Sequence, residues 1–328
     1  MVERYIPEKL QRGDIVRVVA PSWSLSIVDK NVKEIAEQTL EDMGFTVTYG
    51  DHVYESDSFR SSSVQSRTED IHKAFLDTNV KAILTVIGGW NSNQLLQHLD
   101  WDLIKAHPKI FCGFSDIDAL NNAIFAKTGL VTYSVPHFST FGQKYHFGYT
   151  REHFEKSLMS NQPFFLEPSS QWSDDKWYAN QEERHLIHNK GLLAVHEGVA
   201  SGVTISSNLC TLNLLQGTEY YPNITGDVVL FIEEAKLSNP MVFDRNLQSL
   251  VQQRGFMIRG LILGRFQQGA MTKDQLTGIL QSKKKLQDIP IIANADFGHT
   301  DPKATIPIGG TVRMQSSTNN TFIEFIDH

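Results

Sequence analysis

The residues with the clearest chemical content surround Ser115. Residues 111–117 read FCGFSDI, which predicts the end of a buried strand, a tight turn at the serine and an immediate helix start. A turn of this kind lifts the serine hydroxyl out of a sheet, and the helix N-terminus behind it offers backbone N–H groups to a developing oxyanion. The hydrolase consensus G-x-S-x-G has a second glycine where this chain has Ile117, so a serine helix cap followed by Asp116 is the structural alternative.

A second turn with glycines follows a predicted strand at residues 82–87. It reads Gly88-Gly89-Trp90 and continues with polar residues, at the carboxyl edge where open α/β sheets bind their ligands. One of its N–H groups could contribute to the same oxyanion site. The turn lacks the spacing of a dinucleotide fingerprint and the lysine of a P-loop, which argues against phosphate binding. A purely structural turn is the alternative interpretation.

A serine nucleophile needs a base and a group that orients the base. Among the 12 histidines, His299 is the strongest candidate because it lies in a polar loop after an apolar run at residues 291–293. Glu233 and Glu234 directly follow five apolar residues. A buried carboxylate must find a partner, since an unpaired buried charge is costly. A structural ion pair is the alternative role for these carboxylates.

Two further groups of residues could bind ligands. His185, His188 and His196 include an H-x-x-H spacing, but no third ligand of the right type lies at motif distance. We therefore expect no metal site there. Trp172 and Trp177 lie in an acidic, polar loop and could stack on a planar ligand. Packing at a domain boundary would explain the two tryptophans equally well.

Alternating strand and helix patterns would position the serine in the first half of the chain. Predicted strands cover residues 14–20, 45–49, 82–87 and 110–112, and predicted helices lie near residues 28–43, 71–75 and 117–128. Repeated strand–helix units with short connections imply a parallel sheet covered by helices on both faces. We therefore expect an α/β fold whose N-terminal domain carries the serine on a nucleophile elbow.

The second half predicts a mixed α/β domain with antiparallel strands. Residues 140–195 lose the strand–helix pattern, so we expect an N-terminal domain over 1–165, a linker and substrate-covering loop over 166–195, and a C-terminal domain over 196–328. Further predicted strands cover residues 228–232, 261–263 and 291–293, and further helices cover 208–216, 242–253 and a segment from Thr272. The pair Gly309-Gly310, between two β-like runs, predicts a hairpin.

Composition excludes several classes of protein. The 328 residues carry 30 Lys and Arg against 37 Asp and Glu, a net charge of −7, so no basic field attracts nucleic acid. Cys112 and Cys210 form no C-x-x-C pair and favour a reducing cytoplasm. The first residues are charged and no run of ~18 apolar residues occurs, so we expect neither export nor a membrane partner. We also expect no cofactor.

Taken in chain order, these segments resemble one family. The chain resembles the LD-carboxypeptidase family of serine peptidases and, within it, the microcin C immunity branch. The resemblance runs nearly from end to end, through the segments GDIV (13–16), APS (20–22), IGG (87–89), GFSD (113–116), FIEE (231–234) and GH (298–299) followed by Pro302.

The resemblance implies a catalytic triad. The family uses Ser, Glu and His in that chain order, with the nucleophile on the N-terminal domain and the other two on the C-terminal domain. Carried over, these become Ser115, Glu233 and His299, in which the serine attacks a carbonyl, the histidine transfers its proton and the glutamate orients the imidazole. Glu233 is chosen over Glu234 because it matches the family's first acidic position.

The resemblance also implies an oxyanion hole. Backbone N–H groups of Gly88, Gly89 and Asp116 would supply it. The resemblance to a typically dimeric family implies a homodimer as well.

The resemblance leaves more than one substrate open. Murein-recycling members cut the L,D-peptide bond before a terminal D-alanine, whereas the immunity branch cuts the amide between an aspartyl residue and a modified adenylate. The loop with Trp172 and Trp177 resembles that of the immunity branch, where aromatic residues cover the nucleotide; together with Trp90 these form the expected substrate-binding set. A small peptide or a peptidyl-nucleotide is thus the expected partner. A non-catalytic protein that binds a small ligand in the same cleft is the remaining alternative.

Overall fold

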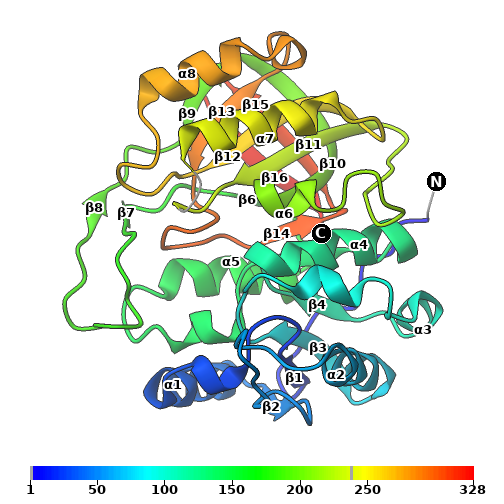
Figure 1. Ribbon diagram of the computed structural model, residues 1–328. Coiled ribbons are helices and arrows are strands. Elements are labelled where there is room, and N and C mark those ends of the chain that lie inside the picture. Colours follow the sequence, from blue (N-terminus) through cyan, green and yellow to red (C-terminus); the bar gives the residue numbers. More distant parts are fainter. Residues whose placement is uncertain (1–2, 237–238) are drawn as a thin grey trace.

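The described residues, 3–236 and 239–328, form two α/β domains, each built on its own sheet, in the computed structural model (Figure 1). The first domain has a six-stranded sheet with the order β14-β5-β4-β3-β1-β2. Its strands are β1 (Ile15–Val19), β2 (Thr46–Tyr49), β3 (Val80–Thr85), β4 (Ile110–Cys112), β5 (Thr132–Ser134) and β14 (Ile306–Ile308). All neighbouring pairs are parallel except β14 with β5.

Helices cover both faces of this sheet because its buried side chains alternate along each strand. On β3, Ile83 packs with helices α2 and α4, whereas Ala82 and Leu84 pack with α1 and α5. The helices are α1 (Lys30–Asp42), α2 (Val64–Leu76), α3 (Trp101–Ala106), α4 (Asp118–Thr128) and α5 (Gly148–Leu158), with 3-10 turns η1 (Leu25–Ile27), η2 (Ser92–Leu95), η3 (Ser115–Ile117) and η4 (Phe138–Gly142). The predicted α/β fold is confirmed.

The second domain has an eight-stranded mixed sheet with the order β6-β16-β15-β10-β11-β12-β13-β9. Strands β10 to β13 run parallel, and the outer pairs are antiparallel, as expected for a mixed domain. Its strands are β6 (Phe164–Phe165), β9 (Leu193–His196), β10 (Gly198–Asn208), β11 (Asp227–Glu233), β12 (Met257–Gly264), β13 (Ile291–Ala295), β15 (Thr311–Ser316) and β16 (Phe322–Asp327).

The remaining elements complete this domain and the loop beside it. The helices are α6 (Leu209–Asn213), α7 (Pro240–Gln252) and α8 (Lys273–Gln281), with the 3-10 turn η5 (Lys284–Leu286). Strands β7 (Gln171–Trp172) and β8 (Ile187–His188) form a separate two-stranded ribbon. Figure 1 shows this ribbon at one side of the molecule, level with the junction of the two domains.

Helix α4 joins the two domains. It is buried on nearly all sides, and it packs against β10 and α6 of the second domain as well as against its own sheet. Asn122 on α4 donates a hydrogen bond from Nδ2 to the carbonyl oxygen of Ser206 on β10, at 3.0 Å. The same helix begins at Asp118, directly after the 3-10 turn η3 that starts at Ser115, so the serine lies where the two domains meet.

The predicted hairpin at Gly309-Gly310 is wrong. Strand β14 pairs with β5 in the first sheet, whereas β15 pairs with β10 and β16 in the second, so the glycines mark a crossing between sheets. Thr204 on β10 holds the crossing through hydrogen bonds from Gly309 N and to Gly310 O. Gly309 has a φ of 90°, and a Cβ atom there would lie 2.4 Å from the ring of Phe125, so only glycine fits.

Three further elements differ from the sequence predictions. Helix α5 lies inside the stretch in which no strand–helix pattern was recognised. The long strand β10 occupies a glycine-containing stretch that was not assigned to a strand. Helix α6 ends at Asn213, shorter than the predicted 208–216, because the chain continues as tight turns up to Gly217.

Candidate active site

Ser115 occupies a strained turn between β4 and α4. Its φ is 64°, in the left-handed region that non-glycine residues rarely adopt. The residue in the cap position of η3 is Phe114, which makes no side-chain cap hydrogen bond, so Ser115 does not serve as the helix cap. Instead its Oγ lies 3.1 Å from Nε2 of His299. The turn therefore has the geometry of a nucleophile elbow.

His299 reaches Ser115 from the loop after β13 and is held there by Glu233. Its Nδ1 atom lies 2.6 Å from Oε2 of Glu233, the last residue of β11, whose side chain is buried. Gly298 permits this approach: it has a φ of 95°, and a Cβ atom there would lie 2.7 Å from the Glu233 side chain. A hydroxyl, an imidazole and a carboxylate thus form one hydrogen-bonded line across the domain junction.

Asn208 positions the two acidic residues at the end of β11. Its Nδ2 atom donates to Oε1 of Glu233 at 2.9 Å and to Oε1 of Glu234 at 3.3 Å. The oxygen of the same amide caps α6 by accepting from Thr211 N at 3.4 Å. Sequence reasoning placed Asn208 only at a helix start. The signal that could have identified Asn208 is its position at the end of β10, because β10 pairs with β11 and places Asn208 opposite Glu233.

Asp118 continues this network into the first domain. Its buried carboxylate accepts hydrogen bonds from Asn208 N at 2.9 Å and from Ser134 Oγ at 3.0 Å. Burial, reinforced by the charge of Glu233, raises the pKa of Asp118 to about 7 although hydrogen bonds oppose the shift. Sequence analysis did not single out Asp118.

The charges around His299 favour its protonated form. Burial alone would lower the pKa of His299, but the charge and hydrogen bond of Glu233, with help from Glu234, raise the pKa above 6.5. Lys303 opposes this rise. By contrast, burial, together with the charges of His299 and Lys303, holds the pKa of His137 well below its ordinary value.

Lys303 is a buried cation beside the nucleophile that sequence analysis did not identify. Its ammonium is paired with the Asp301 carboxylate and lies 5.7 Å from the centre of the Phe114 ring. Gln143 also donates to Asp301, at 3.2 Å. The pair places one positive and one negative charge close to His299 without a direct hydrogen bond to it.

The carboxylate of Asp116 fastens the Gly88-Gly89 turn to the elbow. It accepts hydrogen bonds from Ser22 Oγ at 2.6 Å, from Asn91 N at 3.0 Å and from Ser92 N at 2.9 Å. A Cβ atom on Gly88 would lie 3.2 Å from Cβ of Ser115. Sequence analysis predicted a role for the N–H of Asp116 and did not foresee that its side chain holds the opposite wall of the site.

Gly89 packs closely against Ser22 and Trp23, in the loop that follows β1. A Cβ atom on Gly89 would lie 2.2 Å from Oγ of Ser22, so a larger residue would separate the turn from that loop. A Cβ atom on Gly88 would lie 3.4 Å from Oγ of Ser115, so the backbone of the turn passes close to the serine hydroxyl. An oxyanion hole requires backbone N–H groups near this hydroxyl.

The three tryptophans lie in different surroundings. Trp90 is 66% exposed, next to the Gly88-Gly89 turn. Trp172 is half-buried, and the guanidinium of Arg265 covers one ring face at 5.1 Å, so only the other face is available to a ligand. Trp177 is half-buried and packs edge-on against Tyr178.

The loop that carries Trp172 and Trp177 is attached to the histidine loop. Ser173 and Asp301 exchange backbone hydrogen bonds of 2.7 and 2.8 Å, as an antiparallel bridge. Asp301 is only two residues from His299. This bridge places the tryptophan loop beside the candidate site and joins residues that are far apart in the sequence.

Within the part of the chain that the structure describes, no group of three or more His, Cys, Asp or Glu side chains could hold a metal ion. The three candidate histidines have separate surroundings. The backbone N–H of His185 donates to Asp175, His188 lies on β8, and His196 Nδ1 contacts the carbonyl oxygen of Leu286. Among the same described residues, no helix combines the length and apolar character needed to span a bilayer.

Comparison with known proteins matches both domains. The model of the LD-carboxypeptidase N-terminal domain matches residues 16–135, and that of the LD-carboxypeptidase C-terminal domain matches residues 201–314. The "Putative carboxypeptidase YocD" of Bacillus subtilis is 49% identical over 320 residues, which cover 96% of this chain and 98% of that protein. A crystal structure of a MccF-like protein from Bacillus anthracis is 50% identical, with a TM-score of 0.97 over 99% of this chain and 100% of that one.

Relatives with more specific names are more distant. The Microcin C7 self-immunity protein MccF of Escherichia coli is 30% identical over 325 residues, covering 95% of this chain and 93% of that protein. A structure of MccF in complex with aspartyl sulfamoyl adenosine has a TM-score of 0.88 at 28% identity and covers 99% of each chain. The "Probable murein peptide carboxypeptidase" of Bacillus subtilis is 28% identical over 328 residues, 98% of this chain and 94% of that protein. The chain belongs to the LD-carboxypeptidase family of serine peptidases.

Proposed function

We propose that this protein is a carboxypeptidase-type amide hydrolase that uses Ser115, His299 and Glu233 as a catalytic triad. The observation that carries the proposal is the hydrogen-bonded line of these three side chains, with 3.1 Å between hydroxyl and imidazole and 2.6 Å between imidazole and carboxylate. A nucleophile, a base and an orienting carboxylate that are hydrogen-bonded in this order indicate acyl transfer more specifically than any one of the three residues alone.

The proposed reaction proceeds in two halves. Ser115 Oγ attacks the substrate carbonyl while His299 Nε2 takes the hydroxyl proton, and the new oxyanion is stabilised by N–H groups of Gly88, Gly89 and Asp116. His299 then gives the proton to the leaving nitrogen, which breaks the amide bond and leaves an acyl-serine. A water molecule attacks this ester with the same histidine as base, and the serine is regenerated.

Glu233 has the orienting role in this mechanism. Its hydrogen bond to Nδ1 of His299 fixes the tautomer that leaves Nε2 free to accept a proton. Its charge also stabilises the imidazolium that forms during attack, in agreement with the raised pKa of His299. Asn208 holds the other carboxylate oxygen, so the glutamate cannot rotate away without losing a hydrogen bond.

We further propose that the substrate is a peptidyl-nucleotide, in which the scissile amide joins an aspartyl residue to a modified adenylate. Two observations support this: the tryptophan loop is attached beside His299, and the MccF structure that resembles this chain holds aspartyl sulfamoyl adenosine. In this proposal Trp177, the free face of Trp172 and the exposed Trp90 cover the base of the nucleotide. A murein peptide cut at an L,D-bond is the second candidate, and a relative of similar coverage is named a probable murein peptide carboxypeptidase.

A side-by-side assay tests both candidates. The purified protein is given an aspartyl-adenylate amide and, separately, an L,D-tetrapeptide with a terminal D-alanine. We expect kcat/KM to be at least tenfold higher for the first substrate, a difference of about 1.4 kcal/mol in transition-state binding. Cleavage of the tetrapeptide alone would establish the murein function instead. Binding of either compound without turnover would identify a non-catalytic binding protein.

A pair of loop variants then separates specificity from packing. Trp177→Ala removes a half-buried ring, and Trp177→Phe, which keeps an aromatic ring at the same position, is the matched control. We expect Trp177→Ala to lower the rate on the aspartyl-adenylate amide and to leave any tetrapeptide rate nearly unchanged. Equal losses on both substrates, in a variant that melts like the parent, would show that the ring is structural.

The family resemblance also leads us to propose a homodimer that works in the cytoplasm. Light scattering of the purified protein tests the first point, since a mass near that of two 37.1 kDa chains is expected. A monomer at micromolar concentration would contradict it. Cell fractionation tests the second point.

A further inference from the structure

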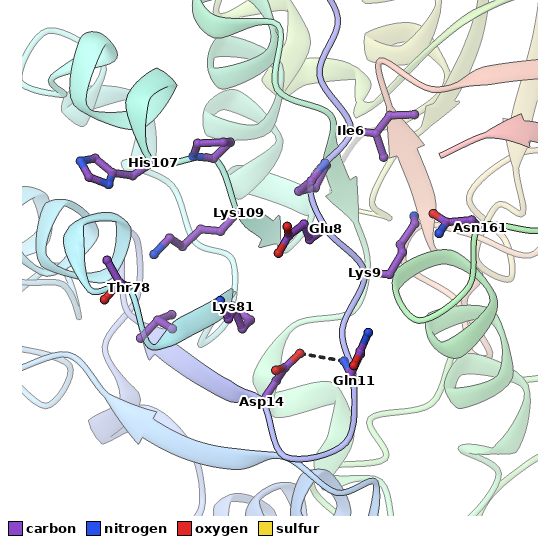
Figure 2. Close-up of a pocket in the computed structure, with 13 residues that line it drawn as sticks. Ile6, Glu8, Lys9, Gln11, Asp14, Thr78, Lys81, His107, Lys109 and Asn161 are labelled. Atoms are coloured by element: carbon purple, nitrogen blue, oxygen red, sulfur yellow. Dashed lines mark hydrogen bonds between the residues drawn. The ribbon is translucent and has the colours of Figure 1, made fainter.

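A cavity of about 920 Å³ opens at the amino edge of the first sheet (Figure 2). Its wall includes the start of β3, the segment from Ile6 to Asp14 and the loop that leads into β4. Lys81 is the second residue of β3, whereas Gly88 follows the far end of the same strand. At a strand rise of ~3.3 Å per residue, the cavity lies roughly 20 Å from the candidate active site.

The cavity is positively lined although the chain is acidic. Lys9, Lys81 and Lys109 contribute three ammonium groups, whereas Glu8 and Asp14 contribute two carboxylates. The whole chain has a net charge of −7. The Asp14 carboxylate is already engaged, since its Oδ2 accepts from Gln11 N at 2.7 Å.

Lys109 is the least exposed lysine of this group. The residue is only 8% exposed, and its ammonium donates to the backbone oxygen of Asp77 at 2.7 Å. The Asp77 carboxylate pairs with Arg17 at 3.1 Å instead. Among the described residues, no carboxylate oxygen lies within 4 Å of the Lys109 ammonium. One of three N–H donors is therefore matched by the protein.

Burial disfavours the charged form of Lys109. Desolvation lowers the pKa of Lys109 to about 8; the charge of Asp77 opposes this shift, whereas the positive charges of Lys81 and Arg17 reinforce it. An anion in the cavity would reverse this cost by supplying acceptors for the remaining donors. Lys109 is thus a buried cation in the cavity wall, and a ligand can accept hydrogen bonds from its remaining N–H donors.

Burial also lowers the pKa of Lys9, to about 7, but the protein already supplies several partners for its side-chain nitrogen. Its ammonium donates to the backbone oxygen of Ser157 at 2.6 Å and also contacts His328 Nδ1 at 3.0 Å. Figure 2 shows Lys9 extending toward Asn161, whereas Lys109 extends toward Thr78. Lys109 and Lys81 are therefore the cations available to a ligand.

We propose that this cavity binds a small molecule through an oxyanion group, a phosphate or a carboxylate, held by Lys109 and Lys81. Lysine ammonium groups bind both kinds of oxyanion through charge-assisted hydrogen bonds. The apolar remainder of such a molecule can lie against Pro7 and Pro108, which line the same cavity. The site is separate from the triad and requires no hydrolysis.

Calorimetric titration of the full chain tests the proposal with two probes, inorganic phosphate and succinate. Binding of one probe and not the other identifies which oxyanion the cavity prefers. Lys109→Met and Lys81→Met remove the two cations, and Lys285→Met, at an exposed lysine elsewhere, is the matched control. We expect each cavity variant to weaken binding roughly tenfold or more and the control to bind like the parent.

Ser115→Ala separates this site from the proposed active site. It should bind the probe with the affinity of the parent, because the triad lies at the other edge of the sheet. Since Lys81 is exposed, Lys81→Met is expected to fold even if Lys109→Met does not. The proposal would be overturned if neither phosphate nor succinate binds to the parent. It would also be overturned if the parent and both cavity variants bind the probe equally well.

Discussion

Nε2 of His299 lies 3.1 Å from Oγ of Ser115, although 184 residues separate them in the sequence. The serine follows β4 of the first sheet and the histidine follows β13 of the second. Their distance is therefore set by the packing of one domain on the other, through α4 and the Asp118–Asn208 hydrogen bond. Predictions about activity must separate loss of chemistry from loss of this packing.

We expect Ser115→Ala to fold like the parent and to lose hydrolysis by ~10⁴-fold or more, because the hydroxyl is the proposed nucleophile. The left-handed φ of 64° adds a stability prediction. Ser115→Gly should be more stable than Ser115→Ala by roughly 1 kcal/mol, since glycine has no Cβ to strain at positive φ. Initial rates and urea unfolding measure the two effects. Activity of either variant within tenfold of the parent would eliminate Ser115 as nucleophile.

Glu233→Gln should damage catalysis far more than Glu234→Gln. Glu233 contacts Nδ1 of His299 at 2.6 Å, whereas the charge of Glu234 makes a smaller contribution to the raised pKa of His299. Both carboxylates accept a hydrogen bond from Asn208, and glutamine keeps an accepting oxygen at either position, so the pair is a matched comparison. The two variants are compared by their kcat values on whichever of the two candidate substrates the parent cleaves faster. The reverse ranking would assign the orienting role to Glu234.

The pH dependence of kcat/KM should have an acid limb above pH 6.5. His299 must be neutral to accept a proton, and its pKa is raised above 6.5, so activity is lost as the pH falls through that raised value. Lys303→Met removes a positive charge that disfavours the imidazolium. The pKa of His299 should then rise further, and the acid limb should move to higher pH.

A double variant controls this experiment. Removing Lys303 alone leaves the Asp301 carboxylate buried without its cation, which can cost about 3–5 kcal/mol of stability. Asp301→Asn combined with Lys303→Met removes both charges and should give a smaller shift of the limb. An acid limb that stays in place, or moves to lower pH, in the single variant would contradict the prediction.

Asp118 should make the folded state less stable as the pH rises toward 8. Burial raises the pKa of Asp118 from 3.8 to about 7, so between these values the folded chain binds a proton that the unfolded chain has lost. The contribution of Asp118 to stability is therefore full below the unfolded value and is lost as the pH rises through about 7.

The substitution Asp118→Asn tests this by mimicking the protonated carboxyl. We expect its free energy of unfolding to approach that of the parent near pH 5 and to decline less between pH 5 and 8. Urea titrations at several pH values measure the difference. A decline as steep as in the parent would show that another group is responsible.

The sequence was most informative where local pattern and chemistry coincide. Apolar runs ended by a polar residue predicted β4 and β11, and these runs carry Ser115 and Glu233 to the junction of the domains. The grouping of His299 with them came from family resemblance, because spacing in the chain says nothing about distances between domains. The structure brings all three residues together, while their catalytic roles remain predictions for the experiments above.

The residues that escaped sequence analysis act through tertiary contacts. Asn208 and Asp118 have no distinctive neighbours in the sequence, and each gains its role only because β10 lies next to β11 and against α4. Lys303 resembles any surface lysine until the fold buries it over Phe114. The hairpin prediction failed for the same reason, since two adjacent β-like runs join different sheets.

The crossing of β14 into the first sheet has a consequence for how the chain folds during synthesis. The edge of β5 is completed only by residues 306–308, which the ribosome makes about 170 residues after β5 itself. The first half must therefore wait with an open strand edge while the second half emerges, a state exposed to mispairing with other nascent chains. Expression of the first half alone would leave that edge permanently unpaired, and the two domains are best regarded as one unit of biosynthesis.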